Sequence, residues 1–273
     1  MMKVACLGRC VLRQSKRSAS PSRHVLTQWI PLLLLTIGLI LYITSPTLQS
    51  AILSLVFPHE TQFTHARKTI LQMTGAHITL TIAATLLSSV FGIFIGILVT
   101  RKAGREFQQL VLKLNAFIQT FPPSAVIILA FPVLGFGWKP ALLALFLYSL
   151  FPVLGNTVIG FNSVSPAAID AAKGMGMTWF QQLHIAELPQ ALPMIITGIR
   201  HSYILNLGTA AIAAVIGGEG LGTIIISGLT LRNSALVLSG TIVISMLAFI
   251  GEQLFQLLSW KQTNHDGSTH IHD

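Results

Sequence analysis

The side chains that could do chemistry in the middle of this chain gather in one short stretch. Its sequence, DAAKGMGMTWFQQLHIAELP, runs from Asp170 to Pro189 and holds Asp170, Lys173 and Glu187, while charged residues are sparse elsewhere between the two tails. The same stretch carries several methionine and aromatic side chains, which are typical anchors for a protein partner. The chemistry that it suggests is binding.

Little else in the sequence suits an enzyme. It contains no HExxH, no GxSxG and no paired carboxylates within an apolar segment. The glycine run Gly217–Gly222 is neither GxGxxG nor a P-loop, and we expect it to break a helix at the outer membrane face, with gating as the alternative role. His265, His270 and His272 could bind a metal ion, but their polar tail offers no rigid scaffold. We therefore expect no catalytic residue, no metal site and no cofactor bound by this chain.

Composition places the charged stretch in a membrane protein. Hydrophobic residues make up 52% of the 273 residues and charged residues only 9%, against about 25% charged in an ordinary soluble domain. The apolar residues form uninterrupted blocks, with neither the period of a strand nor the one-sided stripe of a soluble helix. We therefore expect an all-α polytopic membrane protein with about six transmembrane helices.

Six apolar segments approach the roughly 20 residues that cross a bilayer as a helix. Pro122-Pro123 should begin or kink the third of them. Leu48–Phe57 is too short to cross and should lie at the interface or pack on the bundle. The expected spans are Trp29–Thr44, Gly75–Val99, Leu114–Phe136, Pro140–Gly160, Pro193–Ile216 and Leu236–Leu258.

The net charge of +9 could indicate nucleic-acid binding, but the positions of the basic residues indicate membrane topology instead. Six of the seventeen Lys and Arg precede the first apolar block, and four follow the second, between residues 100 and 113. With both tails in the cytosol, twelve lie on the cytosolic side and four lie outside, while Arg200 falls within a span. The positive-inside rule therefore predicts cytosolic termini and a cytosolic stretch around Asp170.

The two ends of the chain are expected to be cytosolic tails. Residues 1–28 form a basic tail without the apolar region of a signal peptide, so we expect it to be retained. Its Cys6 and Cys10 should stay reduced. Residues 29–74 add a first helix and an outer loop, and residues 259–273 form a polar tail, expected to be disordered from Lys261 onward.

Helix signals divide residues 165–189, here called the elbow, into two short helices. Ser165-Pro166 should cap and open the first helix, over Ala167–Lys173, because proline is tolerated at the first helical position. Gly174 and Gly176 should end it, because glycine takes a positive φ at low steric cost.

The second short helix should begin at a capping box. Thr178 and Gln181 have the required spacing, which predicts a helix over Trp179–Ile185. Leu188-Pro189 should stop that helix, and Pro193 should open the next span. From this pattern alone, a helical loop lying on the bilayer surface and a docking site for a soluble partner are equally good interpretations.

The spacing within the elbow resembles the EAA motif of permease subunits of ABC importers. That motif reads Glu-Ala-Ala, three residues, Gly, nine residues, Ile, one residue, Leu-Pro. Asp170-Ala171-Ala172, Gly176 and Leu188-Pro189 keep its spacing. Asp170 replaces the usual Glu and keeps the carboxylate, whereas Ala186 replaces the Ile and removes a packing side chain. The motif favours the docking interpretation.

Longer stretches resemble the permeases of osmoprotectant importers, the glycine betaine, carnitine and choline group. The similarity spans residues 75–258, which we take as the permease domain, a type I ABC importer (MetI-like) bundle. Pro123 and Glu219 depart from the pattern of this group. The matching stretches are TRK at 100–102, QTFPPS at 119–124, ALFLYSLFPVLGNT at 144–157, AAKGMGMTWFQQL at 171–183, ELPQALPMIITGIR at 187–200 and GTAAIAAVIGGEGLG at 208–222.

This resemblance implies a transport subunit in the bacterial inner membrane, without an ATPase motif of its own. The elbow would be the coupling helix, carried by Asp170, Ala171, Ala172, Gly176, Leu188 and Pro189. The implied partners are cytosolic ATPase subunits that use ATP and Mg, a second permease copy or a sister permease, and an external solute-binding protein. The implied cargo is a quaternary-ammonium osmoprotectant. The alternatives are another small solute, such as an amino acid, or an ion-coupled secondary transporter.

One charged residue lies within an expected span. An arginine at the helix centre costs about 2.5–3.5 kcal/mol on the insertion scale, so Arg200 should face protein or a wet cavity. At helical spacing Thr197, Tyr203 and Asn206 or Leu207 fall near the same face. Either Arg200 snorkels to the cytosolic interface, or the stripe of Arg200, Tyr203 and Asn206 lines the translocation path.

Overall fold

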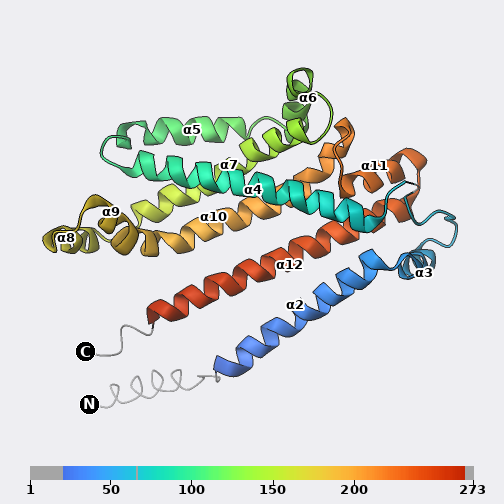
Figure 1. Cartoon of the computed structure of the whole chain (residues 1–273), viewed down its shortest axis with the longest axis horizontal. Coiled ribbons are helices and arrows are strands. Elements are labelled where there is room, and N and C mark those ends of the chain that lie inside the picture. The colour runs from blue at the N-terminus through green and yellow to red at the C-terminus, as the bar shows by residue number, and fades with distance from the viewer. Residues whose placement is uncertain (1–20, 66, 268–273) are drawn as a thin grey trace, which may run out of the picture.

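The computed structural model describes residues 21–65 and 67–267, and every regular element within them is a helix. Long helices run alongside one another, and short helices lie at both ends of the bundle (Figure 1). The fold class expected from the sequence is confirmed. The long helices are α2 (Pro21–Thr44), α4 (Ile70–Thr100), α7 (Trp138–Asn162), α10 (Leu188–Thr209) and α12 (Ser234–Gly267).

In the described part of the chain, four helical segments are long and apolar enough to cross a membrane. Two bent pairs raise the number to six if each pair counts as one span. In the first pair, α2 meets α3 (Pro46–Val56) at 98°. The four long segments are Ile70–Thr100, Trp138–Asn162, Trp179–Ile216 and Ser234–Leu258.

The expected third span over Leu114–Phe136 is divided into two helices at the proline pair. After the 3-10 turn η1 (Arg105–Phe107), α5 (Gln108–Ile118) ends before the two prolines, and α6 (Pro123–Leu134) begins at the second of them. Pro122 has φ −59° and ψ 137°, outside the helical region, because the residue before a proline is driven out of it. The proline pair therefore begins α6, as expected, but also turns the chain through 88°.

The centre of the bundle is α7 packed against both α4 and α10. Glycines allow these helices to approach closely. A Cβ atom on Gly96 of α4 would lie 2.5 Å from Thr157 Cγ2 of α7. A Cβ atom on Gly198 of α10 would lie 2.8 Å from the Pro152 carbonyl oxygen of α7.

Buried polar side chains join α4 to α10 directly. His77, Ser88, Ser202 and Asn206 are all completely buried. Because water is excluded from such a site, each of these polar groups needs a partner within the protein. The interhelical hydrogen bonds are His77 Nε2 to the Leu207 carbonyl oxygen (2.9 Å), Asn206 Nδ2 to Thr85 Oγ1 (3.0 Å) and a contact of the Ser88 and Ser202 hydroxyls (3.0 Å).

The N-terminal helices pack on the outside of this centre, against α12. The Tyr42 hydroxyl on α2 lies 3.1 Å from Ser239 Oγ on α12. Gln49 Nε2 on α3 donates to the Tyr42 carbonyl oxygen at 2.6 Å, and Leu53 is completely buried. The short apolar segment Leu48–Phe57 therefore packs on the bundle, as expected.

The C-terminal tail differs from its prediction. α12 continues to Gly267, so the expectation of disorder from Lys261 is wrong up to that residue. Extending an existing helix adds a hydrogen bond for each residue ordered, whereas a new helix must first be nucleated. The expectation of reduced Cys6 and Cys10 concerns residues outside the described ones. The expectation of no metal site at His265, His270 and His272 likewise concerns side chains outside them.

Candidate functional site

The elbow begins with α8 (Pro166–Gly174), close to the range expected. Pro166 is the first helical residue, because its missing N–H would have no partner there in any case. The Ser165 hydroxyl makes no capping hydrogen bond. The backbone N–H of Ser165 donates instead to Gln190 Oε1 at 3.4 Å, a hydrogen bond that connects the start of the elbow to α10.

Gly176 ends α8 with φ +73°, the left-handed conformation that favours glycine. Its N–H donates to the Lys173 carbonyl oxygen at 2.9 Å, and the N–H of Met177 donates to the Ala172 carbonyl oxygen at 3.1 Å. This pair of hydrogen bonds is a Schellman motif. The hinge expected at Gly176 is therefore present, and it fixes the direction in which the chain leaves α8.

The second half of the elbow begins at the expected capping box. Thr178 N–H donates to Gln181 Oε1 at 2.9 Å, and Gln181 N–H donates to Thr178 Oγ1 at 3.4 Å. The helix α9 (Trp179–Gln181) passes into a π-helical turn, η2 (Gln182–Glu187), which runs straight into α10.

The expectation that Leu188-Pro189 stops this helix is therefore wrong. Pro189 lies in the first turn of α10, and Pro193 lies inside α10 and does not open it. Proline disrupts a helix by removing one hydrogen bond and crowding the carbonyl one turn earlier. The π-helical turn η2 accommodates Pro189, because its hydrogen bonds span five residues and have already replaced the regular α-helical bonds there.

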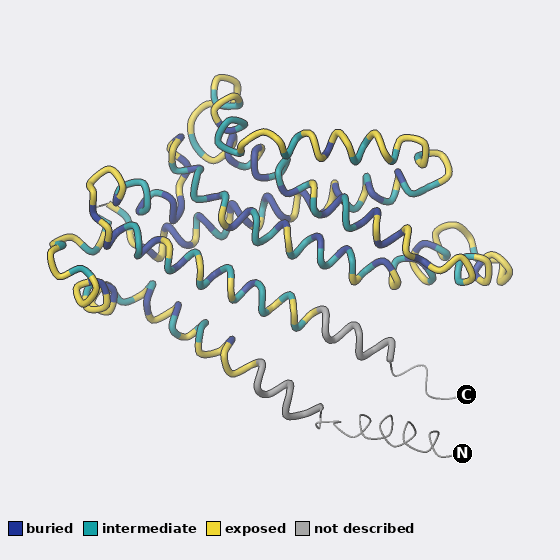
Figure 2. The backbone as a smooth tube through the Cα atoms, turned by 180° about the vertical axis from the view of Figure 1, so that it is seen from behind, coloured by how far each residue is buried: buried dark blue, intermediate teal, exposed yellow. Residues whose placement is uncertain are grey.

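The outer face of the elbow is apolar and exposed. Met175, Trp179, Phe180 and Ile185 are between 56% and 68% exposed. They lie on the part of the chain that projects from one end of the bundle, where most residues of the elbow are exposed (Figure 2). Large apolar side chains gathered at such a tip are typical of a protein interface.

The inner face of the elbow is buried against three helices. Leu183 packs with Phe161 of α7 and with Ala191 and Ile195 of α10, and Ile97 of α4 lies against the same cluster. The buried side of the elbow therefore fixes it to the ends of the central helices.

Glu187 is 4% exposed and forms an ion pair that the sequence did not indicate. Its Oε2 lies 2.6 Å from Nη1 of Arg101, the residue that follows α4. Gln182 Nε2 donates to its other carboxylate oxygen at 2.9 Å. The run Thr100-Arg101-Lys102 was visible in the sequence as positive charge, but nothing local in it pointed to a partner so distant in the chain.

The structure brings the six residues of the EAA-like motif into one elbow, in different surroundings. Asp170 is exposed and lies 3.6 Å from Lys173 Nζ, an exposed pair of small energetic worth. Ala171 is exposed, Ala172 is buried, and Leu188 is half-buried beside the Leu183 cluster. Pro189 is exposed at the start of α10.

The stripe predicted on the fifth span is divided between two neighbouring helices. Arg200 pairs with Glu252 of α12, its Nε donating to Oε2 at 2.6 Å. Tyr203 also faces α12, with its hydroxyl 3.4 Å from the Leu247 carbonyl oxygen, whereas Asn206 faces α4. Glu252 is the acidic residue of the expected span Leu236–Leu258. An acidic residue in an apolar segment needs a basic partner, so the sequence did contain a signal for its pairing with Arg200.

The end of the bundle opposite the elbow holds the glycine run and a polar cavity. Gly217 and Gly220 have φ of +76° and +152° between the 3-10 helix η3 (Ala210–Ile216) and α11 (Leu221–Leu231). The expected helix break is therefore present. Lys68 Nζ lies 2.5 Å from a carboxylate oxygen of Glu219 within this run.

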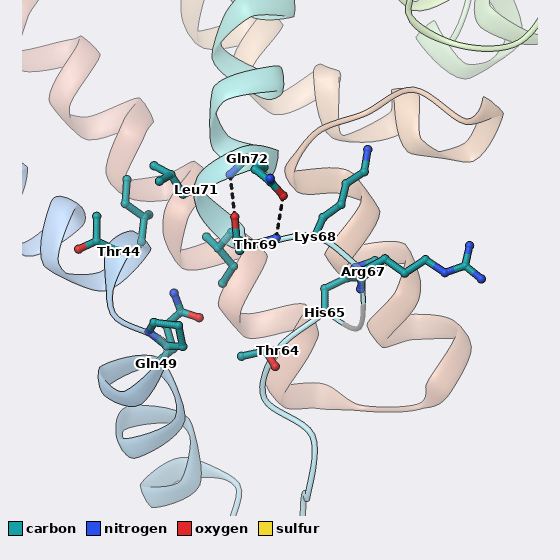
Figure 3. Close-up of a pocket in the computed structure, with 12 residues that line it drawn as sticks. Thr44, Gln49, Thr64, His65, Arg67, Lys68, Thr69, Leu71 and Gln72 are labelled. Carbon is teal, nitrogen blue, oxygen red and sulfur yellow. Dashed lines mark hydrogen bonds between the residues drawn. The ribbon is translucent and has the colours of Figure 1, made fainter.

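The cavity at this end has a volume of about 560 Å³ and lies between α3 and the start of α4 (Figure 3). Thr69 and Gln72 form a capping box at its edge. Burial lowers the pKa of His65 in its wall below 6.5, and the charges of Arg67 and Lys68 lower it further. Among the described residues, no group of three or more His, Cys, Asp or Glu is placed to hold a metal ion.

The helical bundle and its projecting elbow define a class, the membrane permease of a multi-subunit transporter. The family described as "Binding-protein-dependent transport system inner membrane component" matches residues 89–263. This chain belongs to that family. It is accordingly an inner-membrane transport component, and the family resemblance drawn from the elbow is confirmed.

Curated relatives share about a third of their residues with this chain. It is 34% identical over 194 residues to the glycine betaine/carnitine/choline transport system permease protein OpuCB of Bacillus subtilis, covering 71% of this chain and 88% of that protein. It is 38% identical over 184 residues to the osmoprotectant import permease protein OsmY of Salmonella typhimurium, covering 67% and 77%. The inward-facing MetNI methionine ABC transporter has the same fold, with a TM-score of 0.64 at 17% identity, covering 71% and 95%.

Proposed function

We propose that this chain is the membrane-spanning subunit of an ATP-driven importer that moves a quaternary-ammonium osmoprotectant by alternating access. Glycine betaine, choline and carnitine are the candidate cargoes, because relatives at 34–38% identity are named for these solutes or for osmoprotectants. The family and the fold support the permease role. The exposed apolar face of the elbow is the single observation that carries the link to a cytosolic motor.

In this proposal the elbow sits in a groove of a separate ATPase. Exposed apolar side chains provide the contact, and exposed Asp170 and Ala171 lie beside it, with the small alanine permitting close approach. Gly176 sets the angle between the two halves. Buried Ala172 and half-buried Leu188 hold the elbow to the bundle, and Pro189 starts the helix that receives its movement.

The proposed partners follow from this arrangement. Two ATPase subunits would bind and hydrolyse ATP with Mg, since this chain has no Walker motif. A second permease copy or a sister permease would complete the path, and an external binding protein would deliver the solute. Closure of the ATPase subunits would rotate the membrane helices through the elbow.

The proposed orientation places both termini in the cytosol. The start of α2, the end of α12 and the elbow lie at the same end of the bundle (Figure 1). Arg101, Lys102 and Arg105 follow α4 at this end as well. Basic residues concentrate on the cytosolic side of membrane proteins, so this end is the cytosolic one.

We keep Arg200, Tyr203 and Asn206 as the proposed lining of the translocation path, but they face different helices here and Asn206 is completely buried, so another state of the transport cycle must expose it. All three are on α10, the helix that the elbow would move. We expect cysteines that replace Tyr203 and Asn206 to react with a water-soluble thiol reagent in at least one nucleotide state, because alternating access must expose the path. Absence of labelling in every state would remove these residues from the path.

The proposal is tested with the complete importer in lipid vesicles. ATP should drive accumulation of labelled glycine betaine, and unlabelled choline or carnitine should compete if they share the carrier. The cognate binding protein should melt at a higher temperature with its solute. If neither betaine, choline nor carnitine raised the melting temperature of the binding protein, the proposed cargo would be wrong. Uptake driven by an ion gradient without ATP would contradict the assignment as an ATP-driven importer.

A further inference from the structure

The ion pair of Arg101 and Glu187 joins parts of the chain that are otherwise separate. Glu187 lies in η2, immediately before the Leu188-Pro189 pair of the elbow. Both of its carboxylate oxygens have partners, Arg101 Nη1 at 2.6 Å and Gln182 Nε2 at 2.9 Å. The carboxylate is therefore held in one position with respect to the end of α4.

The Arg101 side chain also contacts two aromatic rings. Its guanidinium carbon lies 5.3 Å from the centre of the Phe161 ring at the end of α7 and 5.8 Å from the centre of the Trp179 ring at the start of α9. These distances are within the range of cation–π attraction. One side chain thus contacts the ends of α4 and α7 and the second half of the elbow.

Stability alone gives a poor account of this buried pair. Taking two charges out of water costs about as much as their attraction returns, and apolar residues of similar volume often serve as well or better. Arg101 is also incompletely satisfied, because its Nε and Nη2 have no hydrogen-bond partner among the described residues. A short charged contact does offer a defined geometry, because Arg101 holds one oxygen of Glu187 and Gln182 holds the other.

The position of α4 explains why such a contact is needed. The elbow is continuous with α10 through η2 and is joined by the chain to α7, so its movement reaches both helices through the backbone. α4 comes earlier in the chain and meets the elbow only across space. The apolar contact at Ile97 is non-directional, whereas the ion pair fixes Glu187 against the end of α4.

We propose that Arg101 and Glu187 are positioning residues that transmit movement of the elbow to α4. The inference rests on the proposed coupling function and adds a named route to it. Without the pair, the elbow would still bind its ATPase and move α10, but α4 would follow incompletely. The importer would then hydrolyse ATP with less transport.

The test compares solute imported per ATP hydrolysed in the reconstituted importer. Arg101→Gln and Glu187→Gln should each lower this ratio about tenfold, in the range of mutations that weaken coupling between sites, while ATP hydrolysis continues. Lys102→Gln is the matched control, since it removes the neighbouring positive charge, and should keep the wild-type ratio. A wild-type ratio in both single variants would overturn the proposal.

A charge-reversed pair separates positioning from a general loss of folding. Arg101→Glu and Glu187→Arg should each lose coupling, and the double variant should recover most of the ratio. A double variant that assembles but stays as poorly coupled as the single variants would contradict the proposal. If the wild-type complex and the Lys102→Gln control both imported nothing with ATP, the proposed function itself would be wrong.

Discussion

At the residue scale, Arg200 and Glu252 place opposite charges between α10 and α12, where an unpaired charge is costly. The pair is about three-quarters buried on each side. Removing one partner of such a pair leaves the other charge without compensation, whereas removing both does not. The pair is therefore expected to behave as a unit.

We predict that Arg200→Met or Glu252→Met alone lowers the free energy of unfolding by on the order of 2 kcal/mol, while the double variant stays within about 1 kcal/mol of wild type. Thermal unfolding of the purified protein in detergent measures both. Lys113→Met, which removes an exposed charge, is the control. Single variants as stable as the control would show that the pair does not matter for folding.

The pKa of His65 gives a prediction outside the membrane-spanning segments. Burial first, and then the charges of Arg67 and Lys68, lower this pKa below 6.5 in the folded chain. The folded state thus holds the proton less tightly than the unfolded state. The contribution of His65 to stability is therefore present above pH 6.5 and is lost as the pH falls through the folded-state pKa.

Titration of the His65 imidazole by NMR measures this pKa directly. We expect a value below 6.5 that rises in the Lys68→Gln variant, because one repelling charge is removed. Lys139→Gln removes a charge elsewhere in the chain and should leave the value unchanged. A His65 pKa at or above 6.5 in the wild-type protein would be inconsistent with the packing described for this wall of the cavity.

Two local signals in the sequence were confirmed at this scale, the cap expected from the Ser165 hydroxyl was wrong, and distant pairings could not be predicted. The Schellman ending at Gly176 and the capping box of Thr178 and Gln181 depend on residues within one turn of each other, so their spacing reveals them. The partners of Arg101 and Arg200 depend on how helices far apart in the chain are brought together. A charged residue in an apolar segment signals that a partner exists without naming it.

At the scale of elements, close packing of α4 on α7 depends on glycine. A Cβ atom on Gly96 would lie 2.5 Å from Thr157 Cγ2 and 2.8 Å from Thr157 Cβ, whereas a Cβ atom on Gly75 of the same helix would meet nothing within 4 Å. The branched Thr157 side chain is stiff and cannot give way easily. The two glycines thus form a matched pair for experiment.

We predict that Gly96→Ala destabilises the protein by about 1–3 kcal/mol, because it overpacks the interface of α4 and α7. Gly75→Ala should be neutral or slightly stabilising, because alanine favours the helix over the unfolded chain. The midpoint of thermal unfolding in detergent distinguishes them. Equal midpoints for the two variants would mean that α4 and α7 are not as closely packed as described.

The prolines in the sequence predicted where helices depart from regular geometry, but not whether the helix bends, ends or continues. Pro122-Pro123 was expected to begin or kink a span, and it does begin α6, but the 88° bend could not be predicted from the two prolines. Leu188-Pro189 was expected to end a helix, yet the π-helical turn before it allows the chain to continue. Hydrogen bonding can shift register around a proline, and spacing alone does not show this.

At the scale of the whole molecule, composition predicted a helical membrane bundle but not its internal arrangement. Membrane helices are apolar toward lipid as well as toward protein, so hydrophobic periodicity does not show which face packs. That α4, α7 and α10 pack against one another therefore had to come from the structure. The transport role was accessible earlier because the spacing of residues within the elbow forms a distinct pattern.

We propose that a separate ATPase drives this bundle through the elbow, and uptake by the Gly176→Pro variant is the sharpest test of that coupling. Proline cannot adopt the φ of +73° at this position and lacks the N–H that donates to Lys173. Gly174→Ala is the control, because a Cβ atom there meets nothing within 4 Å. We predict that Gly176→Pro inserts into the membrane at wild-type levels but imports no solute with ATP, while the control imports normally. Undiminished ATP-driven uptake by Gly176→Pro would show that the elbow does not couple the ATPase to transport.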